Sequence, residues 1–118
     1  MAITIEIDPA GLRVADTTDG NKLVGPSLVT SLTVTEYAWS KITVANATAT
    51  SIPFGSVAAA DLVVIRTSVA TTVKLNAEAT GHTVNPLFLW ADSAGGITAV
   101  EVTQSSGAAV TMEYLVAG

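Results

Sequence analysis

The chain offers few side chains for covalent chemistry. It contains one histidine, His82, and no cysteine. A Ser or Cys nucleophile needs an adjacent base, and metal sites combine several imidazole, thiolate or carboxylate ligands. His82 lies in "TGHTVNP", between a glycine and a proline, and no second imidazole exists to join it. We therefore expect His82 to be a loop or interface residue rather than a catalytic or metal-binding one.

The acidic residues give no stronger indication of chemistry. Ten carboxylates are spread along the chain, without the obvious pair of facing acids that a glycosidase needs. The loop "DTTDGN", residues 16–21, holds oxygen ligands of the kind that Ca²⁺ prefers. It lacks the D-x-D-x-D-G spacing and the distal glutamate of a calcium loop, and an Asp-Gly pair is common in tight turns. Walker A, G-x-S-x-G and H-E-x-x-H motifs are absent as well. The sequence predicts a protein without enzymatic activity, cofactor or metal.

Two pairs of aromatic residues are the best candidates for molecular recognition. In extended strands Tyr37 shares a face with Trp39, and Phe88 shares a face with Trp90. Exposed rings either stack on sugars or anchor protein contacts. Sugar-binding faces usually add polar side chains, and beside the second pair only an Asn and an Asp are available. We expect both pairs to lie in the core or at a subunit interface, with carbohydrate binding as the alternative.

The stretch "PLFLWAD", residues 86–92, stands out because both faces of its strand are apolar. Leu87 and Leu89 point one way, while Phe88 and Trp90 point the other. A small β-domain normally buries one face of a strand and exposes the other to water. We interpret this stretch as the place where the core and a subunit contact meet. The pattern leaves open which face belongs to the core, although Leu87 and Leu89 look more core-like and Phe88 with Trp90 more anchor-like.

The composition favours an all-β fold. Hydrophobic residues make up 49% of the chain and charged residues only 13%. Val, Ile and Thr are abundant, and β-branched residues suit a pleated, half-buried surface. Alternating segments recur at roughly ten-residue intervals between turn signals, as in sandwiches and barrels. We predict one domain, residues 1–118, folded as an antiparallel β-sandwich of about eight strands in a jelly-roll arrangement. The expected strands include "AITIEID", "LRVAD", "LVTSLTVTEY", "AWSKITVA", "DLVVIRT", "TTVKLNA", "LFLWAD", "ITAVEVTQ" and "AVTMEYLVAG".

The charge of the chain argues against nucleic acids and anionic membrane surfaces as partners. The net charge is −5, and the five Lys and Arg residues are scattered. Such a chain has no basic patch for phosphate, so we expect neither nucleic-acid nor membrane-surface binding. "MAITIEIDPAG" indicates a strand rather than a signal peptide, and no apolar run approaches the ~20 residues of a membrane span. Low charge with high apolar content suits a protein packed against other subunits.

The second half of the chain resembles a known group of proteins. The segments "AADLVVIRTSVATTVKLN" and "LFLWADSAGGITAVEVTQSSGAAVTMEYLVAG" are similar to small all-β virion proteins of tailed bacteriophages. In those proteins a "VTVKLNG" strand, a "FLL-DG" strand, an "ITSLTVSN" strand and a final "A-VEVLLAG" strand follow in this order. The resemblance covers residues 58–118. This chain differs at "NAEATGHTVNPLFLW", where the loop is longer and Trp90 replaces a smaller aliphatic residue.

The resemblance implies a structural role in the virion, which is assembled in the host cytoplasm. Proteins of this kind decorate capsids as cement proteins, or belong to head fibres and tails. They are generally oligomeric and frequently trimeric. The expected partners are therefore the major capsid protein or another virion protein, together with further copies of the same chain. The resemblance transfers no catalytic residue. The alternative that it leaves is a tail or fibre module that binds host-surface carbohydrate.

Overall fold

A computed structural model describes residues 3–7 and 30–118, and this part of the chain is entirely β-structure and loops. The predicted strand "LRVAD" and the loop "DTTDGN" lie outside the described residues. No helix in the described part is long and apolar enough to cross a membrane. The strands are β1 (Ile3–Ile7), β2 (Thr30–Val34), β3 (Tyr37–Val44), β4 (Thr50–Ser51), β5 (Leu62–Arg66), β6 (Thr71–Leu75), β7 (His82–Val84), β8 (Leu87–Ala91), β9 (Val100–Gln104) and β10 (Val110–Ala117).

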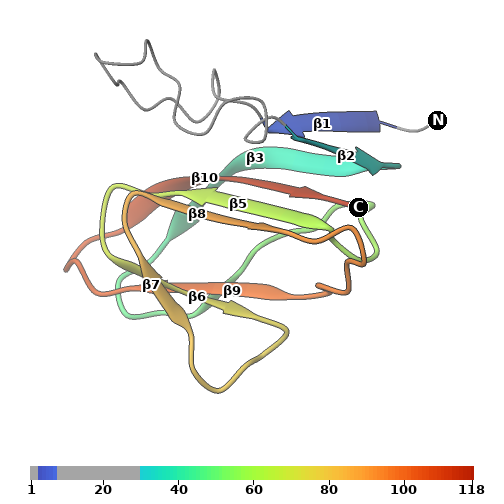
Figure 1. The fold of residues 1–118 in the computed structure, drawn as a ribbon. Coiled ribbons are helices and arrows are strands. Elements are labelled where there is room, and N and C mark those ends of the chain that lie inside the picture. The colour runs from blue at the N-terminus through green and yellow to red at the C-terminus, as the bar shows by residue number, and fades with distance from the viewer. Residues whose placement is uncertain (1–2, 8–29) are drawn as a thin grey trace, which may run out of the picture.

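Eight of these strands form the predicted sandwich. One sheet has the order β3-β10-β5-β8 and the other β4-β9-β6-β7, and all neighbouring strands are antiparallel (Figure 1). The pairs are nested, because β6 pairs with β7, β5 with β8, β4 with β9 and β3 with β10. This nesting is the arrangement of a long hairpin rolled into two layers, which is a jelly roll. The predicted fold class is confirmed.

Strand β10 illustrates why these residues form two layers. Its side chains alternate, so that Met112, Tyr114 and Val116 are buried between the sheets while Thr111 and Glu113 face outward. Strand β6 follows the same rule, with inward Val73 and Leu75. The near-continuous apolar run "DLVVIRT" forms the interior strand β5.

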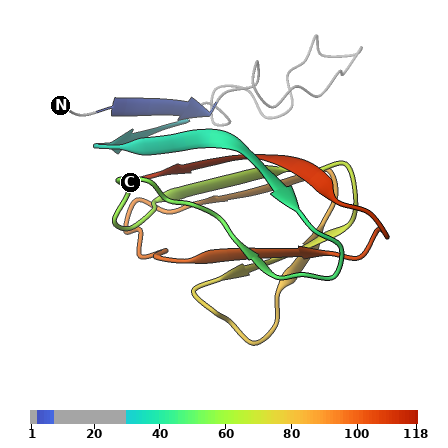
Figure 2. The same ribbon diagram turned by 180° about the vertical axis from the view of Figure 1, so that it is seen from behind.

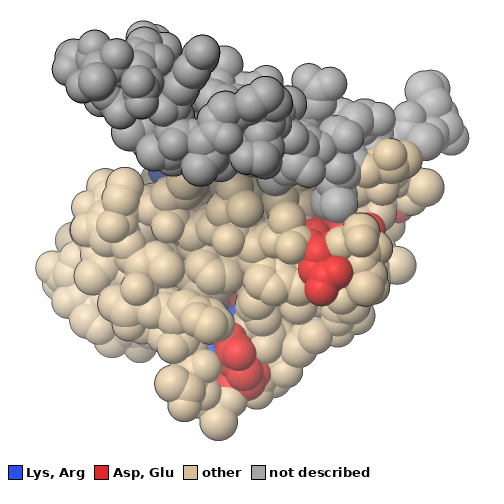
Figure 3. All heavy atoms as spheres, in the orientation of Figure 1, with Lys and Arg blue, Asp and Glu red and all other residues tan. Residues whose placement is uncertain are grey.

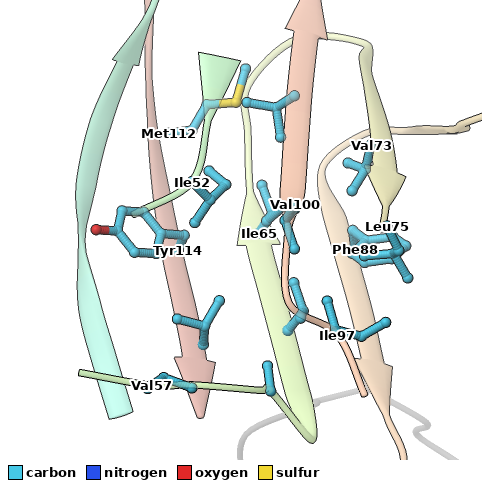
Figure 4. Close-up of a cluster of buried hydrophobic side chains, with 14 of the residues drawn as sticks. Ile52, Val57, Ile65, Val73, Leu75, Phe88, Ile97, Val100, Met112 and Tyr114 are labelled. Atoms are coloured by element: carbon cyan, nitrogen blue, oxygen red, sulfur yellow. The ribbon is translucent and has the colours of Figure 1, made fainter. Parts of the chain in front are cut away.

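The core between the sheets is built mainly of small and medium aliphatic side chains. Figure 4 shows Ile65, Val73, Val100 and Met112 converging from different strands, with the Tyr114 ring at one side. Dense packing of β-branched residues restricts the side-chain rotamers of the core. The Val, Ile and Thr content of the sequence therefore supplies both the strand preference and the core.

A two-stranded sheet, β1 and β2, lies beyond β3 and is not part of the sandwich (Figure 2). Its last residue, Val34, is buried with Leu62 and Ala117 in a cluster separate from the main core. The following turn is fixed by the C-terminus, where the Gly118 carbonyl accepts backbone N–H bonds of 3.0 Å from Thr35 and 2.9 Å from Glu36. One end of the outer face of the β3-β10-β5-β8 sheet is thereby covered.

At the other end of the sandwich, the buried side-chain amide of Gln104 links three segments by hydrogen bonds. Gln104 is only 1% exposed. Its Nε2 donates to the carbonyls of Val44 at 3.0 Å and Ala108 at 2.8 Å. Its Oε1 accepts bonds of 2.8 Å and 2.6 Å from the backbone N–H and the hydroxyl of Ser106. One side chain thus ties β9, the end of β3 and the loop before β10 together.

We predict that Gln104→Met destabilises the protein. Methionine fills a similar volume but cannot bond the buried Val44 carbonyl or the partly buried Ser106 N–H, and an unsatisfied buried group costs roughly 1–3 kcal/mol. The expected loss in the free energy of unfolding is about 2–4 kcal/mol, measured by urea denaturation. The control is Ser105→Ala at the exposed neighbouring position. A loss below about 0.5 kcal/mol would show that this network does not stabilise the sandwich.

Candidate interaction surface

The outer face of the β4-β9-β6-β7 sheet is polar. Thr72 of β6 lies opposite Thr83 of β7 and Thr103 of β9, so three threonines form a row across the sheet. The adjacent row places Lys74 opposite Glu101. Hydroxyls and opposite charges at these positions keep the face compatible with water.

The outer face of the other sheet is different. Strand pairing places Trp39, Leu115, Val64 and Leu89 side by side across all four strands. We call these four residues the apolar row; at about 4.8 Å per strand it spans about 14 Å. Trp39 is 64% exposed and Leu89 is 38% exposed. Leu87, next to the row on β8, is 41% exposed, so several large apolar side chains meet water on one face.

A charged row runs beside the apolar row. Lys41, Glu113, Arg66 and Leu87 occupy successive strands in register. The Arg66 guanidinium contacts the Glu113 carboxylate at 2.7 Å, and the Trp39 Nε1 donates to the same carboxylate at 3.3 Å. Glu113 therefore holds both a cation and the indole in place. Because Arg66 is largely exposed, the ion pair adds little stability and acts mainly on side-chain orientation.

Two adjoining grooves follow from these rows. The first has a volume of about 490 Å³, and its walls include Trp39, Val64, Leu87 and Leu89. The second, of about 430 Å³, is lined by polar residues such as Lys41 and by Arg66 and Glu113, which also line the first. The ion pair thus separates an apolar hollow from a polar one on the same sheet face.

The structure decides which face of β8 belongs to the core, and the result is opposite to the preference drawn from the sequence. Phe88 is 9% exposed and points into the core beside Leu75 (Figure 4). The pairing with β5 explains this: Phe88 lies opposite Ile65, which is fully buried, and cross-strand partners point to the same side. Leu87 and Leu89 consequently face outward, and the preference for them as the core face was wrong. Phe88 is therefore a core residue rather than the interface anchor that we expected.

The other three predicted interface residues divide between two places. Trp90 shares the face of Phe88 and packs, partly buried, against the core. Tyr37 and Trp39 are 52% and 64% exposed on the outer side of β3. The structure thus combines Trp39 with Leu87 and Leu89, and separates it from Phe88 and Trp90. The residues that sequence reasoning missed are Val64, Arg66, Leu87, Leu89, Glu113 and Leu115.

His82 lies at the start of strand β7 rather than in a loop, which corrects the sequence expectation. Its Nε2 is 3.1 Å from the Glu78 Oε1, and its ring lies 5.8 Å from the Phe88 ring between centroids. Within the described residues, no group of three or more His, Asp or Glu side chains could hold a metal ion. His82 helps to cover the aromatic edge of the core.

Comparison of the chain with protein-family models, curated proteins and solved structures found no match.

We predict that two adjacent substitutions in β8 lower the stability of the protein by very different amounts. Phe88→Ala empties part of the core and should lower the free energy of unfolding by about 3 kcal/mol or more. Leu89→Ala removes a partly exposed side chain and should cost less than about 1 kcal/mol. Urea denaturation of both variants and the wild type measures the difference. A larger loss for Leu89→Ala would contradict the face assignment.

Proposed function

We propose that the protein is a non-enzymatic structural component of a tailed-bacteriophage virion, most specifically a capsid decoration protein. It sits on the major capsid protein or another virion protein, and on copies of itself. The resemblance over residues 58–118 supports the virion setting. The observation that carries the contact role is the apolar row on one outer face, where Trp39 and Leu89 are exposed, while the outer face of the other sheet is polar.

The apolar row supplies a driving force for such packing. Burial of apolar surface contributes about 25 cal/mol per Å², so modest contacts repeated around a shell add up. The indole of Trp39 is the best anchor, since aromatic side chains concentrate binding energy at interfaces. Its bond to Glu113 holds the ring before a partner arrives, which reduces the entropy lost on binding.

The charged row gives the same face a means of selecting its partner. Lys41 and Arg66 place two cations around one carboxylate, in a chain whose net charge is −5. A partner with acidic groups around an apolar centre matches this arrangement. Charges at the rim of an interface govern the association rate and the choice of partner more than the affinity.

The contact role predicts that self-association depends on one face. At tens of micromolar, light scattering should give a mass above the 12.0 kDa of one chain, with a trimer favoured by the resemblance. The double variant Trp39→Asp/Leu115→Asp places charge in the apolar row and should lower that mass. The control Thr72→Asp/Thr103→Asp carries the same charge on the polar face and should not. Dissociation by the control alone would contradict the proposal, and cryo-EM of the parent particle would test the virion location.

A second candidate is a tail or fibre module that binds host-surface carbohydrate. Trp39 favours it, because an exposed indole held beside an Arg and a Glu offers both a stacking surface and hydrogen-bonding groups for a sugar. A glycan array separates the two candidates. Binding that is lost in Trp39→Ala and kept in Trp90→Ala would favour the carbohydrate module. Absence of binding would leave the structural role.

A further inference from the structure

In the part of the chain that the structure describes, strand β8 is an unprotected sheet edge. It pairs with β5 on one side and is the last strand of its sheet. Residues 87–91 contain no charge and no proline. Natural edge strands are usually shortened, charged or covered, because a free apolar edge invites another chain to pair with it. The other three edges of the described sandwich meet this expectation, since β3 carries Lys41 while β4 and β7 have two and three residues.

The backbone hydrogen bonds show which groups point to the free edge. At one end of β8 the Thr67 N–H donates to the Pro86 carbonyl at 2.9 Å, and at the other the Asp92 N–H donates to the Asp61 carbonyl at 2.8 Å. Residues of an antiparallel strand alternate in the direction of their N–H and C=O groups. Positions 86, 88, 90 and 92 therefore face β5, and positions 87, 89 and 91 face outward. Within the described residues, no further strand meets them.

From this geometry we propose that β8 pairs antiparallel with β8 of a second copy of the chain about a two-fold axis. The outward groups fix the register, because only odd-numbered positions can exchange hydrogen bonds. The register that pairs all five residues places Leu89 opposite Leu89 of the second copy, and Leu87 opposite Ala91. A shift by two residues in either direction leaves part of the strand unpaired. The result is a continuous eight-stranded sheet.

The side chains are self-complementary in this register. On the inner side Phe88 meets Trp90 of the second copy, twice by symmetry, and aromatic cross-strand pairs are favourable. Trp90 is only partly buried in the single chain and gains cover from this contact. On the outer side the two apolar rows join end to end through Leu89. The nearest cation, Arg66, lies beside Leu87 and so next to Ala91 of the second copy, with no like charge opposite.

The pairing goes beyond the proposed virion role and does not depend on it, because it rests on β8 alone. The pairing also implies a different symmetry from the one that the resemblance favours. A two-fold edge contact gives a dimer, whereas the resemblance favours a trimer. A stable trimer without paired β8 strands would overturn this inference and leave the proposed function standing.

Cysteine cross-linking tests the register directly, because the chain has no cysteine of its own. Leu89→Cys places two thiols on the axis, with Cα atoms about 5.5 Å apart, within the range of a disulfide. Oxidation by copper-phenanthroline in air should convert most of this variant to a covalent dimer on a non-reducing gel. Leu87→Cys is the matched control, because its thiols lie about 13 Å apart along the strand and should not cross-link. The double variant Leu87→Cys/Ala91→Cys should cross-link again.

Analytical ultracentrifugation of the protein without introduced cysteines measures the fraction of dimer independently of a disulfide. The wild type should sediment as a dimer, and Leu89→Lys should reduce the dimer at least tenfold by placing two cations face to face. Thr111→Lys, on the same outer face but away from β8, should leave the dimer unchanged. A wild type that is monomeric at every concentration tested, or equal cross-linking of Leu87→Cys and Leu89→Cys, would overturn the proposal.

Discussion

The arrangement of the sheet that carries the contact surface depends on the two hydrogen-bonded ladders of strand β10. It pairs with β3 along eight residues and with β5 along five, so it fixes the register of three strands at once. Its inward side chains, Met112, Tyr114 and Val116, are part of the core. Its outward Glu113 and Leu115 then occupy the centre of the charged and apolar rows, between β3 and β5. The exposed surface is therefore set by the same pairing that fills the interior.

The two outer faces of the sandwich differ in polarity. Threonines and a Lys–Glu pair give one sheet a surface that water can cover. The other sheet exposes an indole and two leucines beside an ion pair, and part of that face is already covered through Val34. In the orientation of Figure 3 uncharged residues dominate between two acidic groups. A protein with so little charge gains most from burying its apolar face against a partner.

The sequence was sufficient for the layers but not for the contact surface. Alternation grouped the residues that share a face in β6, β9 and β10, because apolar and polar side chains alternate along these strands. In β8 both faces are apolar, so periodicity could not distinguish Phe88 from Leu89, and only the pairing with Ile65 decides. Strand β7 is three residues long, too short for a periodic signal.

The charged row could not be predicted from the sequence, because its residues come from strands that are far apart in the chain. Trp39 and Glu113 are 74 positions apart in the chain, and their hydrogen bond exists only because β3 and β10 are neighbours. Gln104 likewise resembles any polar residue at a strand end, and its role depends on the Val44 carbonyl of β3, 60 positions away in the chain. Non-local strand register, which a single sequence does not specify, determines both sites.

The most direct test of the central claim is to map which outer face is covered when the protein assembles. Adding a soluble gadolinium chelate to a concentrated sample broadens the NMR signals of exposed methyl and indole groups. The account predicts that Leu87, Leu89 and Trp39 are shielded in the assembled protein and become accessible on dilution, while Thr72, Thr83 and Thr103 stay accessible throughout. Shielding of the threonine face, with the leucines and the indole accessible at every concentration, would contradict it.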